Sequence, residues 1–247
     1  TNRNGVLDDN EKDGDENPPD DNRNGRLDGG FYEYVTVYSM EANVDADGEQ
    51  RLNVGDLQNQ QLTTLLRETV GDDRYFQMMD ALRRQRRFDN VLEFYVASGM
   101  ELEEFETIVD RLTTSDNDVL MGTVNVNTAP REVLLCLPGL EESDVDALIQ
   151  ARQADSTNLD TIAWVAGVLD AEKAAAVGGQ ITARSFQHSA DIVSIAGNGR
   201  AYCRRRVVLD TREQPPRIVF CKTLTQMGWP LDTEIVDSLR KGEPLTQ

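Results

Sequence analysis

The first thirty residues carry the side chains best suited to chemistry, because oxygen donors recur there at the spacing of calcium-binding loops. From Asp20 the chain reads Asp-x-Asn-x-Asn-Gly-Arg-x-Asp, which combines side-chain oxygens at alternate positions, a glycine for the sharp turn and a backbone carbonyl at Arg26. A similar run begins at Asp9 and ends on Asp20. The predicted calcium ligands are Asp9, Glu11, Asp13, Asp15, Asn17, Asp20, Asn22, Asn24, Arg26 and Asp28.

The same segment also fits a simpler description, an acidic linker without fixed structure. Residues 1–30 contain nine Asp and Glu and few apolar side chains, so burial cannot offset the entropy that is lost on ordering. The glycine that recurs at one place relative to Asp and Asn favours calcium, and the overlapping loops resemble thrombospondin type 3 and dockerin-like calcium repeats. We therefore expect this segment to be ordered only when calcium neutralises its carboxylates.

Enzymatic chemistry finds little support in the sequence. His188 is the only histidine and lies in a run typical of a strand, so it can build neither a zinc site nor most hydrolytic triads. The motifs of a nucleophile elbow, a zinc protease and a phosphate-binding loop are absent. A pair of carboxylates carries little information in a chain with 44 Asp and Glu among 247 residues. The sequence predicts a protein that is not an enzyme.

The charge of the chain restricts its partners. A formal net charge of -19 disfavours nucleic acid and anionic lipid and favours divalent cations. The basic cluster at residues 83–87 is interpreted as a solvated helix end beside local acids and not as a nucleic-acid site. No apolar run reaches the roughly 18 residues that a membrane span requires. Because the sequence opens with Thr-Asn-Arg-Asn and shows no signal region, we expect it to be part of a longer protein.

Two of the three cysteines could form a disulfide bond. Cys203 and Cys221 lie on two apolar runs that a polar, Pro-containing connection joins. A hairpin that closes near Arg212 would place these cysteines opposite each other, and two half-buried thiols are the alternative. Cys136 lies in a helical segment and is interpreted as an inert core thiol.

Residues 123–140 predict a strand followed by a helical hairpin. An alternating Val-Asn-Val run suits a short strand, after which Thr128 can cap a helix and Pro130 fits its first turn. A Pro-Gly pair then ends this helix, and either Ser143 or Asp144 can cap a second one. The apolar residues of the two predicted helices are Val133, Leu134, Leu137, Val145, Leu148 and Ile149.

The pattern N-x-N-T-A-x-x-x-x-L-x-x-L-P-G resembles two families. One is the helix-hairpin-helix module of competence-type DNA receptors, and the other is type II secretion system protein K, a minor pseudopilin. A DNA-binding hairpin needs a second glycine in its turn and basic residues alongside, because backbone N–H groups must approach a phosphate. Here the turn is followed by four carboxylates that would repel a phosphate, Glu141, Glu142, Asp144 and Asp146. We therefore interpret the hairpin as a module that packs or docks against protein.

The rest of the chain predicts helices first and strands last. Residues 57–112 show three helical apolar stripes, and residues 31–38 favour a helix over a strand. The run Leu52-Asn53-Val54 resembles Val124-Asn125-Val126, which hints at two related helical units. Residues 186–232 show the period of two and the Gly-Asn-Gly turn of an antiparallel three-stranded meander.

Together these segments predict an α+β protein. An antiparallel C-terminal sheet, similar to that of pseudopilins, carries a large all-helical insertion of SAM-like or helix-hairpin-helix-like type, and an acidic calcium-loop segment precedes both. The predicted parts are calcium-binding loops at 1–30, pseudopilin body that leads into the helical insertion at 31–56, a first helical subdomain at 57–112, a second, helix-hairpin-helix-like subdomain at 113–185, a β meander at 186–232 and a polar tail at 233–247.

The resemblance to protein K covers most of the chain and implies a function. It implies a periplasmic protein, held at the inner membrane by an N-terminal helix absent from this chain, that binds no nucleic acid. Its implied partners are other minor pseudopilins of the I and J types, with which it would sit at the tip of a short fibre, prime fibre assembly and serve protein export. Members of the family are also associated with calcium. Two other functions stay open, namely a helix-hairpin-helix nucleic-acid binder and a free-standing extracellular calcium-binding module.

Overall fold

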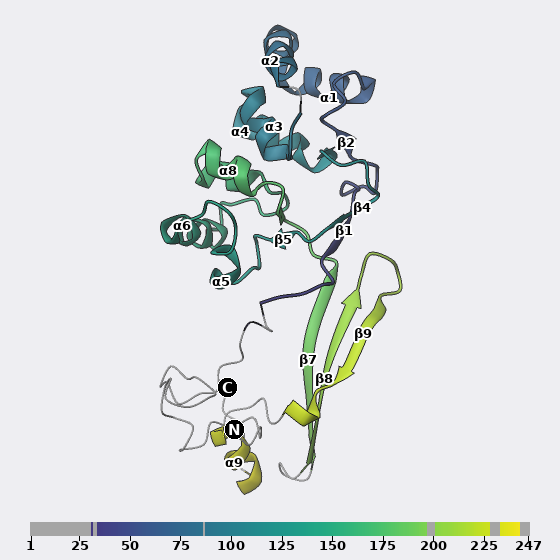
Figure 1. Ribbon diagram of the computed structural model, residues 1–247, viewed down its shortest axis with the longest axis vertical. Helices are drawn as coiled ribbons and strands as arrows, with labels where there is room; N and C mark the ends of the chain where they lie inside the picture. The colour runs from purple at the N-terminus through teal and green to yellow at the C-terminus, as the bar shows by residue number, and fades with distance from the viewer. Residues whose placement is uncertain (1–30, 32–33, 86, 197–200, 228–232, 243–247) are drawn as a thin grey trace. The chain divides into compact units, whose positions relative to one another are not determined.

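The computed structural model describes residues 31, 34–85, 87–196, 201–227 and 233–242. The chain divides into two compact units, of which one comprises residues 36–186 and the other contains residues 187–247. The first unit holds most of the helices, whereas the second holds an antiparallel sheet (Figure 1). This mixture of helices and antiparallel strands agrees with the predicted α+β class.

Helices fill the first half of the helical unit, as the apolar stripes predicted. Strand β2 (Leu52–Asn53) leads into them, and the chain returns through β3 (Leu112–Thr113), which pairs with β2 in parallel. The elements between are α1 (Gln60–Val70), α2 (Asp72–Arg84), α3 (Val91–Ser98), α4 (Leu102–Ile108) and the 3-10 helix η2 (Val109–Arg111). Asn59 and Asn90 begin α1 and α3 by accepting backbone N–H groups of the first turn.

The second half of the helical unit has the same plan. Strand β5 (Val124–Asn125) opens it, and β6 (Ile181–Thr182) closes it by pairing with β5 in parallel. Its helices are α5 (Arg131–Leu134), α6 (Glu142–Arg152), α7 (Ala163–Val168) and α8 (Ala171–Val177). Strands β1 (Met40–Ala42) and β4 (Val119–Met121) form an antiparallel pair in the same unit.

The two halves repeat one local geometry. Asn53 lies opposite Thr113 in the first strand pair, and Asn125 lies opposite Thr182 in the second. In each half the valine after the asparagine donates its backbone N–H to the carbonyl oxygen of that threonine, at 2.8 Å in the first half and 3.0 Å in the second. The sequence similarity between residues 52–54 and 124–126 therefore reflects a structural repeat.

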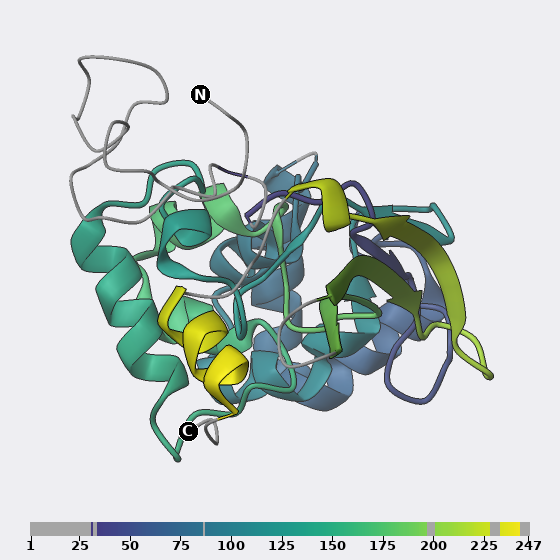
Figure 2. The same ribbon diagram turned by 90° about the horizontal axis from the view of Figure 1, so that it is seen from below.

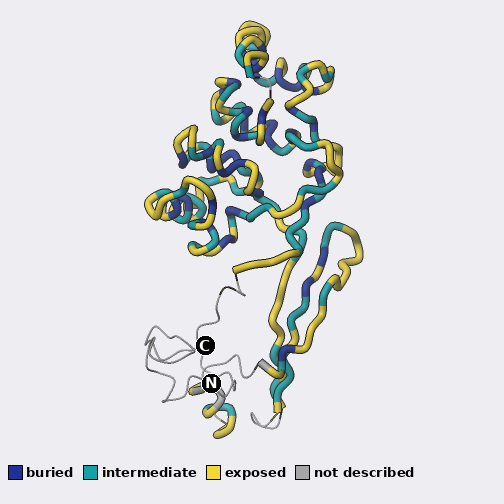
Figure 3. The backbone as a smooth tube through the Cα atoms, in the orientation of Figure 1, coloured by how far each residue is buried: buried dark blue, intermediate teal, exposed yellow. Residues whose placement is uncertain are grey.

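A single apolar core runs through both halves. Helices α3 and α8 are in contact across the two halves, and Asn90 at the start of α3 donates its side-chain N–H to the carbonyl oxygen of Ala175 at 2.8 Å. The buried residues of these helices are the dark blue stretches of the backbone in Figure 3. The largest fully buried side chains of this core are Phe94, Phe105, Leu62, Leu66, Leu82, Leu92, Leu134 and Leu148.

The second unit contains the predicted three-stranded meander. Strands β7 (Gln187–Ala196), β8 (Ala201–Asp210) and β9 (Arg217–Thr223) lie side by side in chain order, and both neighbouring pairs are antiparallel (Figure 1, Figure 2). The 3-10 helix η3 (Thr225–Met227) follows the sheet. Helix α9 (Thr233–Lys241) occupies most of the segment that the sequence predicted as a polar tail.

The prediction of a helix at residues 31–38 is wrong for those residues of this segment that the structure describes. Tyr34 donates its backbone N–H to the carbonyl oxygen of Phe31, which makes a turn, and residues 35–39 lack helical structure. Val35 and Val37 are exposed. Amphipathic spacing stabilises a helix only when an apolar surface covers its apolar face, and these side chains have no such cover.

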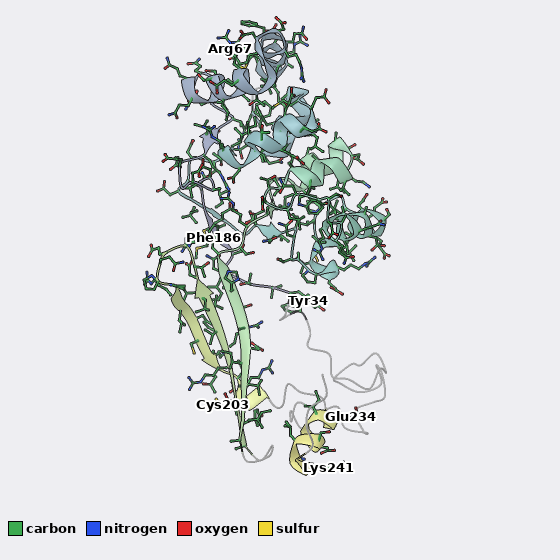
Figure 4. The ribbon with its side chains drawn as sticks, turned by 180° about the vertical axis from the view of Figure 1, so that it is seen from behind. Tyr34, Arg67, Phe186, Cys203, Glu234 and Lys241 are labelled. Carbon is green, nitrogen blue, oxygen red and sulfur yellow. The ribbon has the colours of Figure 1, made fainter. Side chains whose placement is uncertain are left out.

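The predicted disulfide between Cys203 and Cys221 is also wrong, and the register of the sheet gives the reason. Cys221 on β9 lies opposite Val207 of β8. Cys203 (Figure 4) comes four residues before Val207 on β8 and lies opposite Ser194 of β7. Four residues span about 13 Å along a strand, beyond the reach of a disulfide. All three cysteines are free thiols. The predicted hairpin is present, but its connection is centred beyond Arg212, so the two cysteines are out of register.

Candidate docking site

The two asparagines of the N-x-N motif hold the second helical half together. The side-chain amide of Asn127 donates to the carbonyl oxygens of Leu159 at 2.7 Å and Ala183 at 3.1 Å. Its side-chain oxygen accepts from the indole N–H of Trp164 at 3.1 Å. Asn125 accepts the backbone N–H of Asn127 at 2.9 Å. The motif therefore specifies the structure of the module.

The turn of the hairpin contains the predicted glycine. Gly139 has a φ of 75°, which glycine adopts without strain. Helix α6 then begins after Glu141, whose carboxylate accepts the N–H of Asp144, while the Asp144 carboxylate accepts the N–H of Glu141 at 2.8 Å. Asp144 thus takes part in the cap from inside the helix, and the predicted alternative, Ser143, does not cap it.

Helix α5 begins two residues later than the sequence predicted. The backbone N–H groups of Thr128 and Ala129 both donate to the carbonyl oxygen of Asn125, which makes a separate turn before the helix. Helix α5 follows Pro130 and has no side-chain cap. The predicted capping role of Thr128 is therefore wrong.

The inner face of the hairpin is buried in the apolar core. Leu134 and Leu137 from the first arm meet Val145 and Leu148 from the second in the buried cluster, and Trp164 of α7 belongs to the same cluster. These side chains are at most 5% exposed. Only the outer, polar surface of the hairpin is left to meet another molecule.

The four carboxylates of the hairpin lie on that outer surface together with two cations. The guanidinium of Arg131 on α5 lies 3.1 Å from Asp146 and 3.4 Å from Glu142, both on α6. The ammonium of Lys173 on α8 lies 2.7 Å from the carboxylate of Asp144. The outer surface thus contains ion pairs that join α5 and α8 to α6.

The ion pairs of this surface change proton affinities in the direction expected for charged partners. The hydrogen bond from Lys173 lowers the pKa of Asp144, and the same bond raises the pKa of Lys173. Hydrogen bonding to Asp146 raises the pKa of Arg131. Asp144, Lys173 and Arg131 are therefore held in their charged forms.

The hairpin surface keeps an excess of negative charge despite these pairs. Glu141, Glu142, Asp144 and Asp146 contribute -4, and Arg131 with Lys173 contributes +2, which leaves -2 around the turn. The turn has one glycine with positive φ and no second glycine beside it. A phosphate would meet carboxylates instead of open backbone N–H groups, so the geometry disfavours nucleic acid.

A partly buried charge network, which the sequence did not reveal, joins the two helical halves. Arg51 lies 2.7 Å from Glu41 and 3.3 Å from Asp110, and Arg184 forms a second ion pair with Asp110. The hydroxyl of Thr182 donates to Glu41 at 2.6 Å. These residues line a groove of about 440 Å³ between the halves. All these charges are paired, and the pair of Arg184 with Asp110 connects the two halves.

The predicted calcium ligands, from Asp9 to Asp28, lie outside the described residues. Within the part of the chain that the structure describes, no three His, Cys, Asp or Glu are grouped so as to hold a metal ion. The acidic Asp45-x-Asp47-Gly48 segment forms a turn, because the Asp45 carboxylate accepts the backbone N–H groups of Asp47 and Glu49. Calcium binding therefore stays a prediction.

The remaining residues that the sequence singled out show no binding geometry. His188 is an exposed residue of β7. Arg87 lies 3.7 Å from Asp89, and both side chains are largely exposed, so this pair adds little stability. Cys136 is exposed, so its interpretation as a core thiol is wrong. Among the described helices none is long and apolar enough to cross a membrane.

The module therefore consists of a short strand followed by a helical hairpin, whose inner face packs against the core and whose outer face is acidic. Residues 124–184, from β5 to just beyond β6, match the family model of type II secretion system protein K. The match confirms the predicted resemblance to that family over these residues, and it supports a role in type II secretion as an envelope-associated, structural component. No curated protein and no solved structure gave a significant match.

Proposed function

We propose that this protein is a minor pseudopilin that acts at the tip of the type II secretion pseudopilus, where it initiates fibre assembly and supports protein export. The family match over residues 124–184 carries this proposal. The protein would work in the periplasm, anchored to the inner membrane by an N-terminal helix outside this chain. Its direct partners would be minor pseudopilins of the I and J types.

The geometry of the helical unit supports a docking role. The hairpin cannot open its apolar face to a partner without losing core contacts, and the contact between α3 and α8 couples it to the first helical half. Such a module presents a preformed polar surface, and rigid surfaces bind with little loss of conformational entropy. We infer that the helical unit meets protein partners as one body.

Co-purification with the I- and J-type pseudopilins of the same organism tests this proposal. The tagged chain should retain the soluble domains of both proteins through size-exclusion chromatography. A parallel gel-shift measurement with duplex DNA at physiological salt should show no complex, because the hairpin surface is negative. Failure to retain either pseudopilin would overturn the proposal. A shift of the DNA would favour the nucleic-acid alternative.

We also propose that residues 1–30 bind calcium and become ordered with it. The spacing of Asp, Asn and Gly supports this proposal, and Asp20 would serve two overlapping loops. Limited proteolysis should cut this segment faster when a chelator removes calcium, and Asp20→Ala should make the segment sensitive even in calcium. Asp155→Ala, at an exposed position of the helical unit, is the matched control and should behave as the wild type. Cleavage that is independent of calcium would remove this claim, and calcium protection without pseudopilin binding would favour a free-standing calcium module.

A further inference from the structure

The three-stranded sheet has two edges, and they differ in how well they are protected against further pairing. Strand β9 at one edge carries Arg217 and Lys222, and a bulge between Val208 and Leu209 disturbs its pairing with β8. Charges and bulges are the devices that keep edge strands from pairing with other chains. Strand β7 at the other edge pairs with β8 over ten successive residues without a bulge.

Charge does not protect the β7 edge. Asp191 is the only Asp, Glu, Lys or Arg in β7. Its carboxylate lies 2.6 Å from the guanidinium of Arg204 and 3.2 Å from that of Arg206, both on the neighbouring strand. The charge of Asp191 is therefore neutralised within the sheet.

The direction of the free backbone groups of β7 follows from bonds on the other side of β8. The carbonyl oxygen of Arg204 accepts the N–H of Leu224 at 2.8 Å, and its N–H donates to the hydroxyl of Thr225 at 3.0 Å. Both backbone groups of Arg204 thus point away from β7, so Arg204 and its opposite residue, Val193, form a non-hydrogen-bonded pair. The backbone groups of alternate β7 residues then face the open edge, where no described strand pairs with them; these residues are Ser189, Asp191, Val193 and Ile195.

We propose that the open edge of β7 pairs with β7 of a second copy of this chain, antiparallel and about a two-fold axis at Ile192. This register opposes Asp191 to Val193 of the second copy and Ser189 to Ile195 of the second copy, so the outward backbone groups meet in hydrogen-bonded pairs. Moving the axis to Asp191 would place two carboxylates opposite each other, which is unfavourable. The strand is therefore self-complementary in the register centred on Ile192.

The side chains on one face of the sheet add an apolar contribution to this pairing. The register places Ile192, Leu209 and Ile218 on the same face, and these side chains are 52%, 37% and 65% exposed. A two-fold axis at Ile192 brings the two Ile192 side chains into direct contact as a non-hydrogen-bonded pair, where side chains lie closest. Ile192 lies opposite Arg205, and Leu209 lies opposite His188, four residues away along β7, so the apolar contribution at the axis comes from Ile192 itself.

Sedimentation equilibrium of the whole chain, free of other pseudopilins, tests the proposal. The wild type should reach twice the monomer mass at high micromolar concentration, and Ile192→Lys should weaken the dimer by about tenfold or more because two lysines would face each other. Ile218→Lys is the matched control, since it makes the same change on the same face at the other edge, and it should still dimerise. An equimolar mixture of Ile192→Lys and Ile192→Asp should recover a heterodimer, because opposite charges would then meet at the axis.

Three results would overturn the proposal: a monomeric wild type, equal dissociation by the two lysine variants, or no recovery in the mixture. Circular dichroism checks that each variant keeps its sheet. Val193→Pro removes an outward N–H at an edge position where proline is tolerated. It decides the question if Ile192→Lys does not fold, and it should be monomeric. Because these measurements use this chain alone, their failure leaves the proposed function of the protein untouched.

Discussion

Asn127→Ala should destabilise the second helical half, and it should do so more than the replacement of any other asparagine in that half by alanine. In Asn127→Ala the indole N–H of Trp164, a residue that is 4% exposed, loses its acceptor. The carbonyl oxygens of Leu159 and Ala183 lose their donor at the same time. Three lost hydrogen bonds at about 1 kcal/mol each predict a loss of about 3 kcal/mol in the free energy of unfolding.

The isosteric exchange Asn127→Asp separates hydrogen bonding from packing. A carboxylate at this position would direct an oxygen at two carbonyl oxygens, so we expect the pKa of the introduced group to be raised in the folded protein. A raised pKa contributes stability that is present below the ordinary pKa of Asp, about 3.9, and is lost as the pH rises. This variant should therefore be closer to the wild type at acidic pH than at neutral pH.

Urea unfolding followed by tryptophan fluorescence measures both effects. A Trp229→Phe background leaves Trp164 as the only tryptophan, so the signal reports on the contact itself. Asn158→Ala is the control, because Asn158 is exposed and makes one local bond, and its effect should stay below about 0.5 kcal/mol. An unfolding free energy for Asn127→Ala within about 0.5 kcal/mol of the wild type would refute the structural role given to the motif.

Three further predictions concern the sheet and the core. The hydrogen bond from Arg212 lowers the pKa of Asp210 to about 2. This pair therefore stabilises the sheet above pH ~4 by roughly 1 kcal/mol after solvent screening, and this stability is lost as the pH falls through about 2. Arg212→Gln should abolish this acid dependence in thermal melts. Val207→Cys should form a disulfide with Cys221 in oxidising buffer, whereas peptide mapping that shows a native bridge to another cysteine would contradict the register. Leu134→Ala should cost about 2–5 kcal/mol in urea titrations because the side chain is fully buried, and a loss below about 1 kcal/mol would contradict its place in the core.

Features that depend on neighbouring residues could be predicted from the sequence. The hairpin of residues 131–152 follows from apolar spacing and a Pro-Gly turn, and both signals act within a few residues. The meander follows from alternating apolar residues and short polar connections. The similarity of residues 52–54 and 124–126 also predicted the structural repeat, because each run must turn from a strand into helices.

Features that depend on distant partners could not be predicted. Strand β5 consists of two residues and pairs with residues 57 positions later, so no local pattern marks it as parallel to β6. The ion pair of Arg184 with Asp110 likewise arises only when the helical halves are assembled. The register of Cys221 depends on a bulge and on the length of a connection, and neither has a signature that fixes the offset between two strands.

The most direct test of a role in type II secretion is the extracellular protein profile of the organism that carries this gene, before and after its deletion. We predict that deletion leaves type II substrates in the periplasm, that the intact gene restores their export, and that a gene encoding Asn127→Ala restores it less well in proportion to its lost stability. An unchanged extracellular profile in the deletion strain, with the remaining secretion genes intact, would contradict the assignment.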